Sequence, residues 1–218
     1  MKKLENAVNP VTKESILTDV STYYTTKLAQ HGATPQGVDW NGTASHDNRH
    51  HQFLRLLASD PIASVLDLGC GYGDFLGFLR KNGHSGHFIG YDISPAMIAE
   101  AERLHGRSAD REWHVGAEPT EQADYAIASG IMNVKGDVPT AEWHAYVCDI
   151  LLLLGRSSRR GFAVNMLTMS SDPERRRDNL YYADPVEMLQ FCLQNFGRSV
   201  ALMQDYGLYE FTIIVRHS

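Results

Sequence analysis

The sequence has few cysteines, no long apolar run and no excess of positive charge. Its 218 residues include three cysteines, Cys70, Cys148 and Cys192, none of them in a CxxC pair, so neither a zinc knuckle nor a redox dithiol is predicted. The longest apolar run, Ile150 to Leu154, is far too short to cross a membrane. Residues 1–6 lack the apolar core of a signal peptide. Together with reduced thiols, this indicates a cytoplasmic protein.

The charge balance is acidic, with a formal net charge of −6 and a pI of about 5.9. Such a chain has no overall positive field to hold a phosphate backbone. We therefore expect neither a nucleic acid nor a membrane as partner, and the oligomeric state stays open. The apolar content of 43% is that of an ordinary globular protein with a core of its own.

From Val65 onward, segments whose apolar residues are spaced as in a strand alternate with segments whose apolar residues are spaced as in a helix. This alternation is typical of a mainly parallel sheet with helices on both faces. Only residues 205–207 separate the last two strands, which should form a hairpin and bring one antiparallel strand into the sheet. The expected fold is α/β: a Rossmann-like, doubly wound, mostly parallel seven-stranded sheet with an antiparallel C-terminal strand. Strands are predicted at 65–68, 88–91, 112–115, 125–128, 161–166, 199–204 and 209–215, and helices at 75–79, 95–104, 141–154 and 185–195.

Residues 1–60 have a different pattern. Helices are predicted near 13–31 and 45–59, with a loop containing Gly and Pro between them. We interpret residues 1–60 as an N-terminal helical cap or lid and residues 61–218 as the main domain.

A glycine-rich turn follows the first strand of the main domain. Residues 65–75 read VLDLGCGYGDF, a strand that runs into a turn and then a helix. The pattern is an acid followed by G-x-G-x-G, and not the G-x-G-x-x-G of dinucleotide sites. A carboxylate at Asp67 is unfavourable beside a pyrophosphate and favourable beside an ammonium group. Asp92, at the end of the next strand, can accept hydrogen bonds from both hydroxyls of a ribose.

These residues resemble the signature of class I S-adenosylmethionine-dependent methyltransferases, over about residues 60–218. The resemblance implies that Asp67, Gly69, Cys70 and Gly71 border the methionine end of S-adenosylmethionine. It implies that Asp92 holds the ribose. The adenine is then expected to lie between Ile93 and Met97, with Ala117 or Glu118 beyond the third strand.

The fourth strand ends in Ser129 and continues to Asn133. In this family the end of that strand lies beside the methyl group, so the resemblance makes Ser129 a cofactor contact and Asn133 a substrate contact. The tetrapeptide with which related enzymes hold a nucleobase is missing here, which favours a small-molecule acceptor. Tyr181 and Tyr182, after the fifth strand, are expected over the acceptor pocket. Asp184 either binds the acceptor or caps the helix at Pro185, and we favour the cap.

The cap supplies the candidates for proton transfer, since a methyl transfer aligns three atoms and sometimes removes a proton. His31, His46 and Tyr24 are the catalytic candidates, and Trp40 is expected beside the sulfonium through cation–π attraction. Arg49 either pairs with the cofactor carboxylate or lies exposed on its helix. A surface or structural role is the alternative for each histidine.

We expect an enzyme that transfers a methyl group from S-adenosylmethionine to oxygen or nitrogen of a small metabolite. A non-catalytic cofactor-binding or scaffold protein of the same fold is one alternative, and a nicotinamide-dependent oxidoreductase is another. The basic runs at 156–160 and 175–177 are read as solvated charge, with an anionic acceptor as the alternative. No sequence motif indicates a metal ion.

Overall fold

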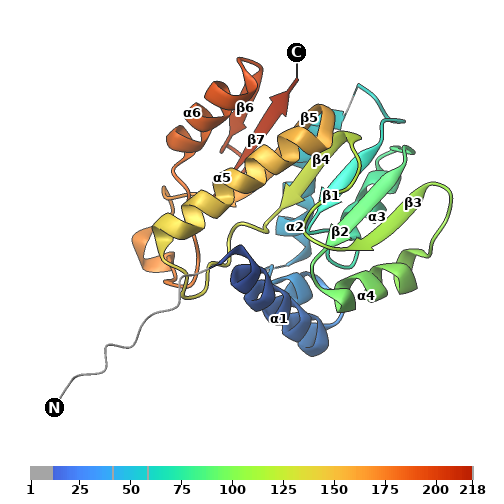
Figure 1. Ribbon diagram of the computed structural model, residues 1–218, viewed down its shortest axis with the longest axis horizontal. Helices are drawn as coiled ribbons and strands as arrows, with labels where there is room; N and C mark the ends of the chain where they lie inside the picture. The colour runs from blue at the N-terminus through green and yellow to red at the C-terminus, as the bar shows by residue number, and fades with distance from the viewer. Residues whose placement is uncertain (1–11, 41, 58, 218) are drawn as a thin grey trace.

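A seven-stranded sheet forms the centre of the computed structural model, which describes residues 12–40, 42–57 and 59–217 (Figure 1). The strand order is β3-β2-β1-β4-β5-β7-β6. Only β7 is antiparallel to its neighbours β5 and β6, as predicted from the terminal hairpin. The strands are β1 (Val65–Leu68), β2 (Phe88–Asp92), β3 (Arg111–Val115), β4 (Ala123–Ser129), β5 (Ser158–Leu167), β6 (Val200–Met203) and β7 (Glu210–Arg216).

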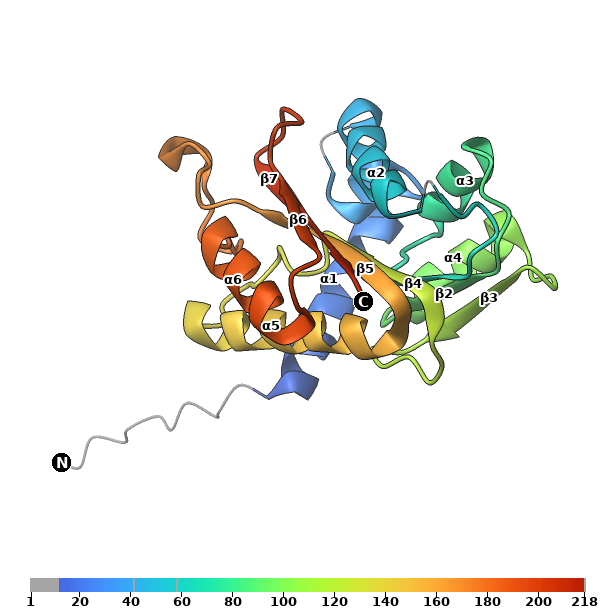
Figure 2. The same ribbon diagram turned by 90° about the horizontal axis from the view of Figure 1, so that it is seen from above.

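Helices cover both faces of the sheet (Figure 2). Helices α5 (Thr140–Ser157) and α6 (Pro185–Phe196) pack on one face, in a core that includes Trp143 and Phe162. Helices α2 (Thr43–Leu57), α3 (Asp74–Lys81) and α4 (Pro95–His105) pack on the other. Both faces of the central strands are therefore buried, which explains why β1 and β2 are apolar without alternation.

Helix α1 (Lys13–His31) and the short helix η1 (Pro35–Val38) lie across the carboxyl ends of the central strands. A capping box between Thr12 and Ser15 starts α1. Among its described residues only Ile16 is fully buried. Leu17 and Val20 lie at the edge of the core and also, with Tyr24, line a cavity.

The expected cap divides into two parts in the structure. Helix α1 and η1 cover the strand ends, as a lid would. Helix α2, by contrast, inserts Phe53, Leu56 and Leu57 into the core beneath the sheet, where each is at most 2% exposed. The boundary at residue 60 therefore separates elements that share one core. Residues 1–11 of the expected cap lie outside the described residues.

The predicted strands and helices are confirmed, with ends that move by a few residues. Ser94 caps α4, with Pro95 at its first position. Asp184 caps α6, accepting hydrogen bonds from the backbone N–H groups of Val186 and Glu187, so the cap interpretation of Asp184 is confirmed. In the described part of the chain, no helix combines the length and apolarity needed to cross a membrane.

Candidate active site

Three cavities adjoin one another at the carboxyl ends of the central strands. The central cavity lies beneath α1. The glycine-loop cavity borders the turn after β1. The arginine-lined cavity is bounded by η1, the loop after β4 and residues 171–182. Val38 and Trp40 line all three, so these two side chains stand where the cavities meet.

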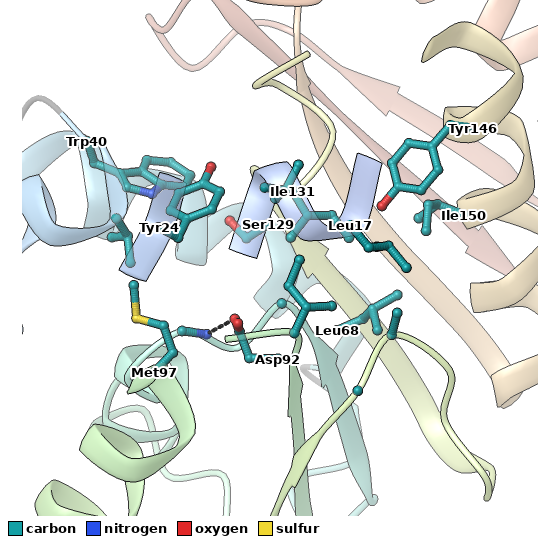
Figure 3. A pocket seen from close by; sticks show the side chains of 17 residues that line it. Leu17, Tyr24, Trp40, Leu68, Asp92, Met97, Ser129, Ile131, Tyr146 and Ile150 are labelled. Atoms are coloured by element: carbon teal, nitrogen blue, oxygen red, sulfur yellow. Dashed lines mark hydrogen bonds between the residues drawn. The ribbon is translucent and has the colours of Figure 1, made fainter. Parts of the chain in front are cut away.

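The central cavity is mainly apolar. Figure 3 shows Trp40 and Tyr24 at one end and Tyr146 and Ile150 at the other. The floor carries Asp92, from the end of β2. The lining also contains Ile93, Met97 and Ala117, which the family resemblance assigns to the adenine, and Ser129, which it assigns to the cofactor near the methyl group.

Asp92 is buried and holds the backbone around it. Its Oδ2 accepts a hydrogen bond from the N–H of Gly71 at 2.9 Å (Figure 3), and its Oδ1 accepts one from the N–H of Ser94 at 2.8 Å. Burial raises the pKa of Asp92 to about 6, against the effect of these two hydrogen bonds. Each carboxylate oxygen has a second lone pair, so Asp92 can still accept ribose hydroxyls while it holds the glycine turn.

Asp67 lines the glycine-loop cavity and is only 3% exposed. No described residue donates a hydrogen bond to its side chain. Burial, and then the charge of Asp92, raise the pKa of Asp67 to about 8. A buried carboxyl group without a donor is energetically unfavourable once ionised. An ammonium group in this cavity would supply the missing partner.

The turn between these acids needs glycine at Gly69, where φ is +78°. A Cβ there would lie 2.1 Å from Cγ2 of Ile131. The N–H groups of Gly69 and Cys70 both donate to the carbonyl of Tyr91, which ties the turn to β2. Cys70 is a buried thiol whose pKa burial raises far above its usual value, so it fills space beside the cavity and is not a nucleophile.

Of the two positions expected for Arg49, the exposed one is wrong, and the contact with the cofactor carboxylate stays a prediction. Arg49 is not exposed, and its Nε donates to both carboxylate oxygens of Glu210, at 2.7 and 2.9 Å. Its guanidinium carbon lies 3.7 Å from the centre of the Trp40 ring. Arg49 lines the arginine-lined cavity and not the cavity beside the glycine turn. The ion pair with Glu210 thus fixes the tryptophan that separates the cavities.

The fold places the three catalytic candidates from the N-terminal cap at different sites. Tyr24 lines both the central and the arginine-lined cavities, and burial raises the pKa of its phenol well above the usual range, so it remains protonated. His46 lines the glycine-loop cavity. His31 is exposed at the end of α1 and borders none of the cavities described here. The structure therefore does not place His31 with the other two catalytic candidates.

Of the residues expected to contact the acceptor, two line a cavity and one lies in the core. Asn133 and Tyr182 line the arginine-lined cavity. Asn133 also accepts a hydrogen bond from the N–H of Leu167. Tyr181 is instead a core residue, 4% exposed, with its hydroxyl 2.8 Å from Nδ1 of His144. The substrate contact predicted for Tyr181 is thus wrong in this structure, because neighbouring residues point to opposite sides of the segment.

On the adenine side, Ala117 lines the central cavity. Glu118 does not line this cavity and pairs with Nζ of Lys13 at 2.6 Å. The alternative in which Ala117 and the backbone suffice is therefore the one that the geometry favours.

Comparison with known proteins places these observations in a family. Residues 66–146 match the family described as a methyltransferase domain. The chain is 46% identical over 160 residues to a Mycobacterium tuberculosis protein named "Putative methyltransferase Rv1506c", covering 73% of this chain and 95% of that one. This chain belongs to the methyltransferases. The identification as an S-adenosylmethionine-dependent methyltransferase is thereby confirmed.

More distant relatives agree on the fold. A trans-aconitate 2-methyltransferase of Methylobacterium nodulans is 29% identical over 136 residues, which are 60% of this chain and 49% of that enzyme. The magnesium protoporphyrin IX methyltransferase of Synechocystis PCC 6803 with bound S-adenosylmethionine superposes with a TM-score of 0.65 at 16% identity, covering 96% and 100% of the two chains. The N-methyltransferase NodS of Bradyrhizobium japonicum has a TM-score of 0.63 at 15% identity, covering 91% and 98%.

Several lining residues of this methyltransferase were not among the sequence predictions. Val38, Tyr146 and Glu210 all border the cavities. Glu210 carried a usable signal, because an acid at the start of an apolar strand needs a buried partner. Val38 and Tyr146 carried none, since both look like ordinary core residues.

Proposed function

We propose that this methyltransferase binds S-adenosylmethionine in the central and glycine-loop cavities and methylates a small anionic metabolite in the arginine-lined cavity. The observation that carries the proposal is the junction of the cavities at Tyr24, Val38 and Trp40. A donor on one side of Trp40 and an acceptor on the other would meet there.

The residues present fit this donor. Asp67 has no hydrogen-bond donor from the described residues and suits the ammonium group of an amino acid. Asp92 suits a ribose, and Ile93 and Met97 provide apolar surfaces for an adenine. When bound, the sulfonium supplies an electrophilic methyl group.

The acceptor cavity favours a carboxylate. Its lining includes four arginines, Arg49 and residues 175–177, and three acids, of which Glu210 pairs with Arg49 and Asp39 with Lys27. Glu174, the third acid, and Asp172, which pairs with Arg175, offset part of the charge at 175–177, and positive charge is left over there. The relative named for trans-aconitate, a carboxylate, supports this class.

A carboxylate acceptor also removes the need for a base. One carboxylate oxygen would form the new bond to the methyl carbon as the carbon–sulfur bond breaks, with its electron pair going to sulfur. No proton is lost, so the product would be a methyl ester. The protonated phenol of Tyr24 would orient the acceptor by donating a hydrogen bond, and Trp40 would exclude water.

The free thiols of all three cysteines support the expected cytoplasmic location.

The test is methyl transfer from S-adenosylmethionine carrying a labelled methyl group. The acceptor panel should contain di- and tricarboxylic acids, matched primary amides, and neutral alcohols and amines. We expect labelled, alkali-labile esters from the carboxylic acids. Label only in amines or alcohols would overturn the anionic acceptor, and tight cofactor binding without transfer to any acceptor would favour the non-catalytic alternative.

A further inference from the structure

A second cluster of polar side chains lies beside the glycine-loop cavity. His46 and His50 stand one turn apart on α2, and Asp74 is the first residue of α3. Oδ2 of Asp74 lies 3.3 Å from Nδ1 of His46 and 3.8 Å from Nδ1 of His50. One ligand atom from each residue lies within 4.8 Å of the others.

The two imidazoles are buried, and one of them is incompletely bonded. His50 is 3% exposed, and its Nδ1 has no hydrogen-bond partner among the described residues. The unbonded Nδ1 of His50 is therefore available as a ligand atom.

Packing alone does not account for this cluster. The ring of His50 lies 4.9 Å from that of Phe75 and 5.1 Å from that of Phe78, so a phenylalanine would fill the same space. A histidine there leaves a buried nitrogen without a partner, which is unfavourable unless a ligand binds it.

We propose that His46, His50 and Asp74 bind a divalent transition-metal ion of the zinc class. Ligand atoms around tetrahedral zinc lie about 3.3 Å apart, given zinc–nitrogen distances of about 2.0–2.1 Å. The two distances from Asp74, 3.3 and 3.8 Å, lie near this value, and no pair of ligand atoms is more than 4.8 Å apart. Two histidines and one carboxylate leave a fourth position open.

The open position faces the glycine-loop cavity, because all three ligands line that cavity together with Asp67 and Gly69. A metal ion there would share the cavity with Asp67 and present a positive charge to an anionic group in the same space. The proposal rests on the ligand geometry and holds whether or not the acceptor is a carboxylate.

The chain offers a matched control cluster. Glu112, His114 and Glu121 also bring three ligand atoms together, but none of the three is buried, and Glu112 is already bonded to His87 and His114. Solvated groups with these partners should hold an ion weakly, so Glu112→Gln should leave metal binding unchanged.

The experiment titrates the full chain, freed of metal with a chelator, with Co²⁺ followed by visible absorption and with Zn²⁺ followed by calorimetry. We expect one equivalent to bind with a tetrahedral cobalt spectrum. His50→Phe, which keeps the aromatic packing, and Asp74→Asn, at a half-exposed side chain, should each weaken binding at least tenfold. Zinc should raise the melting temperature of the parent protein and not that of Asp74→Asn.

Three outcomes would overturn the metal site: binding of less than one equivalent, unchanged affinity in both His50→Phe and Asp74→Asn, or loss of binding in Glu112→Gln. Circular dichroism of each metal-free variant shows whether it is folded. Binding of S-adenosylhomocysteine to the metal-free protein is measured separately, so that failure of the metal site and failure of the proposed function are distinguished.

Discussion

The glycine-loop cavity and the arginine-lined cavity hold their charges in opposite ways. In the first, Asp67 is buried and receives no hydrogen bond from the described residues. In the second, Arg49 is neutralised by Glu210, while Arg175, Arg176 and Arg177 are exposed. The first cavity therefore has an unmet requirement for one cation, and the second has solvated charges with an excess of positive charge.

This difference predicts that the glycine-loop cavity is selective for one ligand and that the arginine-lined cavity is less selective. A buried, unpaired acid is stabilised only by a group of the right charge in the right place. Exposed arginines attract anions of many shapes with little cost when the anion is absent. We expect a fixed donor and a less restricted acceptor, and the following predictions test this contrast.

The largest effect should come from the buried pair at the edge of the arginine-lined cavity. Glu210→Gln leaves the guanidinium of Arg49 buried without its counter-charge, and should lower the free energy of unfolding by about 3–5 kcal/mol. Urea denaturation measures this. Replacing both partners, Arg49→Met with Glu210→Leu, should recover most of the loss. A single change that costs no more than about 1 kcal/mol, the value of an exposed pair, would contradict the role of the pair.

The next effect concerns the acid beside the glycine turn. Asp67→Asn removes a charge-assisted hydrogen bond to the ligand ammonium group and should weaken binding of S-adenosylhomocysteine by about 2 kcal/mol, roughly 30-fold. Calorimetry measures the affinity. Arg177→Ala is the control and should bind the same ligand normally. Equal losses in both variants would remove the distinction between the two cavities.

Protonation of Asp67 gives a pH dependence with a definite sign. The raised pKa, about 8, means that the ligand-free folded protein holds a proton that the unfolded chain releases near its ordinary pKa. Stability of the ligand-free protein should therefore fall as the pH rises from about 4 to about 8. The ammonium ligand needs the ionised form, so its affinity should rise with pH over about 6–8, by up to about tenfold per unit.

Calorimetry in two buffers of different ionisation enthalpy checks this point, because binding at pH 7 should release a proton. Asp67→Asn should abolish the release. An affinity that is the same at every pH in this range would show that Asp67 is already ionised or does not contact the ligand.

The smallest effect should appear in the exposed arginines. Arg177 forms no ion pair with the described residues, and Arg177→Ala should raise KM for a carboxylate acceptor a few-fold, less than about 1 kcal/mol. Because exposed charges are screened, the effect should shrink in high salt. Steady-state kinetics measure both, with kcat expected to stay constant. An unchanged KM at low salt would support the interpretation of these arginines as solvated charge alone.

The mostly parallel seven-stranded sheet and the acidic side of the candidate site could be predicted from the sequence. Asp67 and Asp92 end consecutive strands that pair directly, so local patterns place them together. The partner of Arg49 could not be predicted, because Glu210 lies 161 residues away and no local pattern links them. The cluster of His46, His50 and Asp74 was missed for the same reason, since it joins two helices.

Tyr181 and Tyr182 show that the direction of a side chain is also difficult to predict from the sequence. Both stood in one short segment, and only the backbone geometry decides that Tyr182 faces the cavity while Tyr181 bonds His144 in the core. A prediction that places a segment correctly can still reverse adjacent side chains.

The hydrogen bonds from Arg49 to Glu210 also bear on how the polypeptide is made. Synthesis proceeds from the N-terminus, and early segments begin to fold before later ones exist. Helix α2 must wait for β7 to leave the ribosome before its arginine meets a counter-ion. Until then the guanidinium has to stay in water, so the packing of this part of α2 against the sheet is a late event in folding.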